Sequence, residues 1–152
     1  MKNVLVIDDD KKICWAFEQF LTSEGYHARI ANNAEEGLRD IAADAPDVVL
    51  LDVKLPGMSG LEALAKIKAR HRRVIVIIIT AYDDIGTTIE AMRLQAFDFV
   101  PKPIDLDIVK SVLDRAFRTQ AVRSTLPIEV TDETLTEQIG HRLVGKLSLI
   151  HI

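Results

Sequence analysis

The sequence predicts an α/β protein built on a doubly wound, five-stranded parallel sheet with helices on both faces. Two short runs that are entirely apolar, Val4–Ile7 and Val48–Leu51, are typical of strands buried on both faces. Strand-like runs alternate with segments of helical periodicity along residues 1–118, which is the pattern of repeated strand–helix units. An acidic residue follows each of the two apolar runs directly, so the ends of these strands are a candidate site.

Five strands are expected, and turn-forming or capping residues bound each of them. The fourth is the most apolar and should be central, whereas the fifth is short and should end at Pro101–Pro103. The expected strands cover Val4–Ile7, Tyr26–Ala31, Val48–Leu51, Val74–Ile79 and Phe97–Val100.

Each helix follows a residue suited to begin or precede it. Asp10, Asn33 and Asp105 are expected N-caps, and Ser59 forms a capping box with Glu62. The first helix should run to about Glu24 and end at Gly25. Apolar positions at helical spacing are Ile13, Ala16, Phe17, Phe20 and Leu21 in the first helix, Leu38 and Ile41 in the second, Ile85, Ile89 and Met92 in the fourth, and Val109, Val112, Leu113, Ala116 and Phe117 in the last.

The predicted strand order is 2-1-3-4-5, a flavodoxin-like arrangement with right-handed crossovers. This order has its switch point between the first and third strands, at the carboxyl edge of the sheet, where ligands bind in open α/β folds. Asp8, Asp9 and Asp52 should converge there.

Composition excludes several classes of function. A formal net charge of -4 and a pI near 5.5 argue against nucleic-acid binding through the overall charge, a test that a local basic patch would escape, and we expect no direct binding of nucleic acid. The longest apolar run, Val74–Ile79, is far shorter than the ~20 residues of a membrane-spanning helix. The single cysteine, Cys14, fits a reducing compartment, and the N-terminus lacks the features of a signal peptide. We therefore expect a cytoplasmic chain with no membrane association.

The clustered carboxylates predict a metal site for phosphoryl chemistry. Carboxylates at one sheet edge repel one another unless a hard cation neutralises them, which favours Mg²⁺, with Mn²⁺ as a substitute. An aspartate can attack phosphorus and form an acyl phosphate. Asp9 and Asp52 would hold the ion, with Asp8 acting through water. Lys102 would supply a second cation and Thr80 a hydroxyl donor to the phosphoryl oxygens.

At these residues the chain resembles the receiver domain of two-component response regulators over about residues 2–118. The matching stretches are Val4–Asp10, Leu50–Gly60, Ile79–Ala81 and Val100–Pro103. The resemblance implies that Asp52 is the phosphoacceptor. It also implies that Asp8 and Asp9 are the acidic metal pair, and that the backbone carbonyl of Lys54 is a further metal ligand.

The resemblance also assigns a switch. Thr80 would be the switch hydroxyl and Lys102 the salt-bridging lysine, followed by a cis peptide to Pro103. Phe99 would be the switch aromatic, in place of the commoner tyrosine. A sensor histidine kinase is the implied phosphodonor. The implied output is a change of the surface formed by the fourth helix, the fifth strand and the last helix, which could also form a homodimer.

A narrower resemblance concerns the segment Ala96–Leu106. It is similar to receivers of the nitrogen-regulation class, which precede a sigma-54-dependent AAA+ ATPase, and Leu143–Lys146 is similar to the usual entry into that ATPase. We therefore expect a receiver domain at 1–118, a linker at 119–146 and a truncated transcriptional regulator. The residues 147–152 match an in-frame transposase-type sequencing adapter, so we interpret them as an artefactual tail.

Two rival functions use the same residue types. Phosphatases of the haloacid-dehalogenase class carry a second acid two residues after the nucleophile, where this chain has Lys54. A flavodoxin-type binding module would need a phosphate-binding loop after the first strand, where Asp8–Asp10 would repel phosphate without a metal. We therefore expect a signalling receiver and not an enzyme, one that catalyses only its own phosphorylation and dephosphorylation.

Two further residues of the first helix, Trp15 and Cys14, lie outside the predicted site. Trp15 should be partly exposed, either as a contact for a partner or as an ordinary surface residue. Cys14 is expected to be a small, half-buried packing residue.

Overall fold

The structure is a computed structural model that describes residues 1–125. Its sheet has five parallel strands in the order β2-β1-β3-β4-β5, so the predicted fold class and strand order are confirmed. The strands are β1 (Asn3–Ile7), β2 (His27–Ala31), β3 (Val48–Asp52), β4 (Ile75–Ala81) and β5 (Asp98–Lys102). The helices are α1 (Lys11–Ser23), α2 (Ala34–Ala43), α3 (Gly60–Arg70), α4 (Ile85–Arg93) and α5 (Leu106–Thr125).

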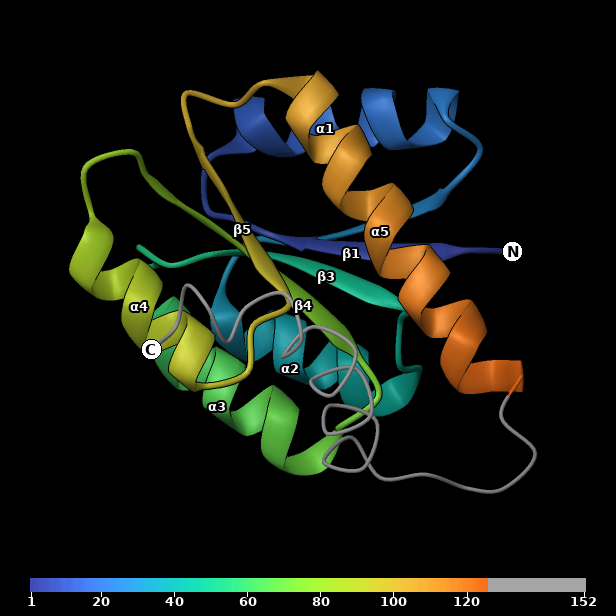
Figure 1. Ribbon diagram of the computed structural model, residues 1–152. Helices are drawn as coiled ribbons and strands as arrows, with labels where there is room; N and C mark the ends of the chain where they lie inside the picture. Colours follow the sequence, from blue (N-terminus) through green and yellow to red (C-terminus); the bar gives the residue numbers. More distant parts are fainter. Residues whose placement is uncertain (126–152) are drawn as a thin grey trace, which may run out of the picture. The chain divides into compact units, whose positions relative to one another are not determined.

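The helices form two layers on the sheet. Helices α1 and α5 cover one face, and α2, α3 and α4 cover the other (Figure 1). Side chains of β1 alternate between the two layers, because successive residues of a strand point to opposite faces: Val4 and Val6 pack with α1 and α5, and Leu5 and Ile7 with α2 and α3. All four are fully buried. The sheet is therefore buried on both sides, as the apolar runs predict.

Local capping explains where the helices begin. The Asp10 carboxylate accepts hydrogen bonds from the backbone N–H of Lys12 and Ile13, which would otherwise lack partners in the first turn of α1. Asn33 caps α2 and Ser59 caps α3 in the same way, as the sequence predicts.

At their carboxyl ends, β4 and β5 each continue two residues further than the sequence indicates. Pairing between β4 and β5 continues through Thr80 with Pro101 and Ala81 with Lys102, so Thr80 and Lys102 lie within strands and not just after them. Pro101 is tolerated because β5 is an edge strand, where a missing N–H need not break the ladder.

Helix α5 is longer than the sequence predicts. Helix α5 continues to Thr125, into the range for which the sequence predicts a linker. The remainder of that linker and the predicted tail at 147–152 lie outside the described residues, so the predicted domain boundaries stay predictions.

Gly60 lets α3 begin in direct contact with the end of β3. A Cβ atom at this position would lie 2.3 Å from the Asp52 carbonyl oxygen and 2.5 Å from the Val53 Cα, both of them backbone atoms that cannot move aside cheaply. We expect Gly60→Ala to lower the free energy of unfolding by about 3 kcal/mol, measured by urea denaturation.

Gly86 is the matched control, because a Cβ there would meet open space within α4. Gly86→Ala should raise stability by about 0.5–1 kcal/mol through helix propensity alone. A Gly60→Ala variant as stable as the unaltered chain would show that β3 and α3 can separate without cost.

Candidate metal and phosphoryl site

Three carboxylates meet at the carboxyl edge of the sheet. Ile7 at the end of β1 pairs with Leu51 of β3. The residues that follow them in sequence, Asp8 and Asp52, are therefore neighbours. Asp9 follows in the loop to α1, and one carboxylate oxygen of each of the three residues lies within 4.8 Å of the others. Asp8 and Asp52 are buried, whereas Asp9 is exposed. The predicted convergence of these three side chains is therefore present.

Asp8 is held in a setting that disfavours its charge. Its Oδ1 accepts a hydrogen bond from the Asp10 backbone N–H at 2.9 Å, but its buried Oδ2 has no partner among the described residues. Burial raises the pKa of Asp8 to about 6, opposed by the Asp10 hydrogen bond and reinforced by the charge of Asp52. An unpartnered, buried carboxylate oxygen of this kind fits a cation or its bound water.

Asp52 is oriented through both of its oxygens. The backbone N–H of Lys54 donates to Oδ1 at 3.1 Å, and the Lys102 ammonium lies 3.3 Å from Oδ2. The contact with Lys54 also brings that residue's backbone to the cluster, and the role of its carbonyl as a metal ligand stays a prediction. Asp52 thus neighbours both the Lys102 ammonium and the carboxylates of Asp8 and Asp9.

Thr80 and Phe99, the two residues predicted to form a switch, lie on the neighbouring strands β4 and β5. Thr80 directly follows Ile79, the β4 partner of Asp52, and its buried hydroxyl oxygen has no hydrogen-bond partner among the described residues. A phosphoryl oxygen could accept from this hydroxyl without displacing another bond. Phe99 on the neighbouring β5 is 40% exposed. The Lys102–Pro103 peptide bond that follows β5 is cis.

The three carboxylates fit a hard divalent cation. Two oxygens on opposite sides of a magnesium ion lie about 4 Å apart, close to the spacing of this cluster, and Mg²⁺ keeps several waters that can bridge the remaining gaps. The donor set consists of carboxylate oxygens, which Mg²⁺ and Mn²⁺ prefer.

Sequence reasoning missed two residues that donate hydrogen bonds to the backbone of Asp8. The Cys14 thiol donates to the Asp8 carbonyl at 3.2 Å, and the Asn32 amide donates to the same oxygen at 3.4 Å. Cys14 is only 5% exposed, so it is more deeply buried than expected. Its spacing from Phe17 and Leu21 could have indicated burial, but no sequence signal indicates the hydrogen bond. Trp15 is 66% exposed, in line with its predicted position.

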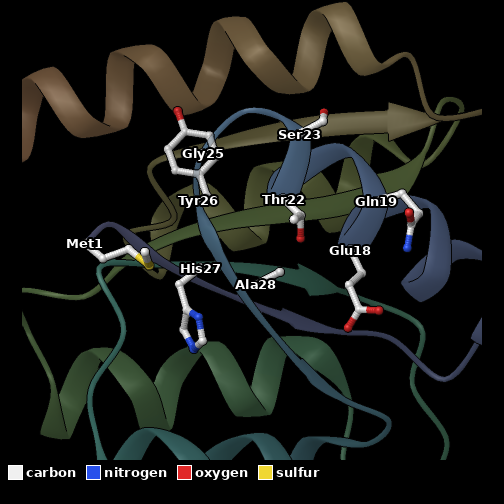
Figure 2. A pocket seen from close by; sticks show the side chains of 9 residues that line it. All are labelled: Met1, Glu18, Gln19, Thr22, Ser23, Gly25, Tyr26, His27 and Ala28. Atoms are coloured by element: carbon white, nitrogen blue, oxygen red, sulfur yellow. The ribbon is translucent and has the colours of Figure 1, made fainter.

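A groove elsewhere on the surface carries none of the predicted site residues. It has a volume of about 610 Å³ and lies between the end of α1 and β2 (Figure 2). Its lining residues are Met1, Glu18, Gln19, Thr22, Ser23, Gly25, Tyr26, His27 and Ala28. The carboxylate cluster, not this groove, brings together groups suited to chemistry.

The chain belongs to the response regulator receiver domain family, whose model matches residues 4–114. It is 38% identical to the DNA-binding transcriptional regulator NtrC of Salmonella typhimurium over 154 residues, which cover 95% of this chain and 33% of that protein. It is 35% identical to the nitrogen assimilation regulatory protein NtrX of Azorhizobium caulinodans, covering 97% of this chain and 32% of that protein.

A solved structure agrees with these relatives. The receiver domain of NtrX from Brucella abortus superposes with a TM-score of 0.73 at 36% identity, covering 76% of this chain and 98% of that domain. The resemblance to receivers of the nitrogen-regulation class is therefore confirmed. The chain spans about a third of the length of the curated relatives it matches. Within residues 1–125, no helix has the length and apolar character needed to span a membrane.

Proposed function

We propose that this chain is a phosphoacceptor in which Asp52 receives a phosphoryl group from a phosphohistidine of a sensor histidine kinase. The observation that supports this most strongly is the placement of the buried Asp52 carboxylate beside Lys102 and within the carboxylate cluster. Membership of the receiver family makes a histidine kinase the natural donor, since its phosphohistidine carries a good leaving group.

In the proposed reaction, a carboxylate oxygen of Asp52 attacks phosphorus as the bond to the imidazole nitrogen breaks, and the imidazole leaves with the bonding electron pair. Asp8, Asp9, Asp52 and the Lys54 carbonyl would hold Mg²⁺, or Mn²⁺ in its place. When bound, the ion neutralises charge on the phosphoryl oxygens. Lys102 neutralises a further oxygen and Thr80 donates a hydrogen bond to another. Water later hydrolyses the acyl phosphate.

The added charge, about -1.5 to -2, would act on the switch residues. Drawing Thr80 towards the phosphoryl group opens space next to β5 and favours burial of Phe99. This would bias the surface of α4, β5 and α5, which carries the exposed side chains of Ile85, Ile89 and Met92, between two arrangements. We propose that this surface mediates homodimerisation and that the chain is the receiver part of a cytoplasmic sigma-54-dependent transcriptional regulator that contacts neither nucleic acid nor membrane itself.

The direct test is incubation with acetyl phosphate, followed by intact mass measurement. We expect a gain of one phosphoryl group with Mg²⁺ or Mn²⁺ present and no gain when EDTA removes the metal. Labelling that is independent of metal would contradict the proposal. Sustained hydrolysis of a generic phosphate ester would favour the phosphatase alternative, because a receiver catalyses only its own phosphorylation and dephosphorylation.

Lys102→Met should slow labelling by acetyl phosphate about 100-fold, measured as the rate of mass gain at saturating Mg²⁺. The reason is that the ammonium beside Asp52 Oδ2 would no longer stabilise charge in the transition state. Lys110→Met removes the same charge at a surface pair with Glu24 and should change the rate less than twofold. Equal rates for the two variants would remove Lys102 from the reaction.

Genomic DNA decides the extent of the natural protein. Reading past codon 146 should show an ATPase coding sequence in place of codons 147–152. Genuine coding sequence for these six residues in an intact genome would contradict the interpretation of an artefactual tail.

A further inference from the structure

Two side chains outside the carboxylate cluster converge on one backbone oxygen within it. The Asp8 carbonyl accepts from the Cys14 thiol of α1 at 3.2 Å and from the Asn32 amide, in the loop after β2, at 3.4 Å. The Asn32 amide also lies 3.9 Å from the Cys14 sulfur. Two segments that are distant in sequence therefore hold the peptide that joins Asp8 to Asp9.

We propose that Cys14 and Asn32 are positioning residues for the metal site, because together they fix the plane of the Asp8–Asp9 peptide and so direct the Asp9 carboxylate to the ion. The inference rests on the proposed function, since it assigns these residues a role in metal binding. It concerns two residues that contact neither the ion nor the phosphoryl group.

The need for such support follows from how differently the two acidic residues are held. Asp8 is buried and bonded to the Asp10 N–H through its side chain. Asp9 is exposed, and its carboxylate accepts no hydrogen bond from any residue within 1–125. The direction of the Asp9 side chain therefore depends on its backbone, and hence on the peptide whose oxygen Cys14 and Asn32 hold.

The thiol is suited to act as a permanent donor. Burial, and after it the charge of the surrounding carboxylates with Asp8 first among them, raises the pKa of Cys14 to about 11. The sulfur thus keeps its proton at neutral pH. Removing this donor would leave a buried carbonyl with only the longer bond from Asn32, and the peptide could then rotate towards other donors or water.

A packing role is the alternative, because buried cysteines often act as small apolar side chains. The two roles differ in what a substitution changes. Loss of packing lowers stability but leaves the affinity of the folded protein for metal unchanged. Loss of the donor changes that affinity, and a hydroxyl in place of the thiol restores it.

The test is calorimetric titration of Mg²⁺ into the full chain and its variants, at a temperature where circular dichroism shows each to be folded. Outer-shell partners of metal ligands typically change affinity by about 10–100-fold. We expect Cys14→Ala to weaken binding about tenfold and Asn32→Ala about threefold, because its bond is longer and only partly buried. Cys14→Ser, which keeps a donor, should stay within about threefold of the unaltered chain.

Asn33→Ala is the matched control for Asn32→Ala. Asn33 caps α2 through the Glu36 N–H and does not contact Asp8, so its loss should lower the melting temperature without changing Mg²⁺ affinity. Unchanged affinity in Cys14→Ala, or equal weakening in Cys14→Ala and Cys14→Ser, overturns the inference while leaving the proposed function intact. If the unaltered chain binds no Mg²⁺, both the proposed function and the inference fail.

Discussion

Asp52→Asn is expected to abolish phosphorylation by acetyl phosphate, so that intact mass shows no phosphoryl gain after an incubation that fully labels the unaltered chain. An amide oxygen is a poor nucleophile and gives no stable acyl phosphate, and it also removes one charge from the proposed metal ligands. The amide can still accept the hydrogen bond from the Lys54 N–H, so the local backbone should be preserved. The expected loss therefore reflects chemistry and not unfolding.

Asp83→Asn is a suitable control for this variant. Asp83 is an exposed residue just after β4, so its substitution makes the same change in charge without altering the cluster. It should be labelled at the rate of the unaltered chain. A full phosphoryl gain in Asp52→Asn would place the phosphoacceptor elsewhere and refute the assignment.

A second readout of the Asp52→Asn variant concerns Asp8. The charge of Asp52 is one of the causes that raise the pKa of Asp8, after burial. Removing that charge should lower the pKa of Asp8 towards its ordinary value, which carboxyl-detected NMR titration of the metal-free protein can follow. No change would mean that the two carboxylates are not coupled in solution.

The fold could be predicted from the sequence because its signals are local and agree with one another. The run Val48–Leu51 contains no polar residue, and such a strand is stable only when helices cover both faces of the sheet. Capping residues at Asp10, Asn33 and Ser59 fix where helices begin, independently of tertiary contacts. The strand order then follows from short, right-handed connections.

The positions of the candidate site residues were predictable for a related reason. Asp8 directly follows β1 and Asp52 is the last residue of β3, at the same edge of a parallel sheet, so the topology brings them together whatever the detailed packing. Thr80 and Lys102 were expected at that edge for the same reason. Both lie inside strands, because β4 and β5 continue to pair beyond Ile79 and Val100.

The supporting residues could not be predicted, because nothing local identifies them. The bond from Asn32 to the Asp8 carbonyl joins residues 24 positions apart and depends on how the loop after β2 turns. Cys14 has the spacing of a core residue, and only its three-dimensional position shows that its thiol meets a carbonyl. The exposed apolar positions of α4 are a similar case: Ile85 and Ile89 have helical spacing, yet they face outwards.

Asp8→Asn is expected to stabilise the metal-free protein at pH 7.5 by about 3 kcal/mol, measured by urea unfolding in EDTA. The pKa of Asp8 is about 6 in the folded chain and near 3.8 when it is unfolded, so the folded state binds the proton more tightly. Below pH 3.8 the group is neutral in both states and costs nothing. As pH rises from about 4 to 6, the folded state is progressively destabilised, and above pH 6 the full cost is present.

The same substitution should therefore have a pH-dependent effect that distinguishes it from general stabilisation. Asp8→Asn and the unaltered chain should differ little in stability near pH 4 and most above pH 6. Asparagine keeps an oxygen that can accept the hydrogen bond from the Asp10 N–H, so this contact should not offset the gain. In the presence of Mg²⁺ the unaltered chain should instead be more stable than Asp8→Asn, because only the chain with all three carboxylates gains the full stabilisation from bound metal.

Asp9→Asn completes the comparison, since Asp9 belongs to the same cluster but is exposed. Without metal it should change stability by less than about 0.5 kcal/mol, as expected for a surface substitution. With metal it should lose affinity as Asp8→Asn does. The two variants thus separate the cost of burying a charge from the gain of binding an ion. If Asp8→Asn were less stable than the unaltered chain at pH 7.5 in EDTA, the buried charge of Asp8 would not destabilise the metal-free protein.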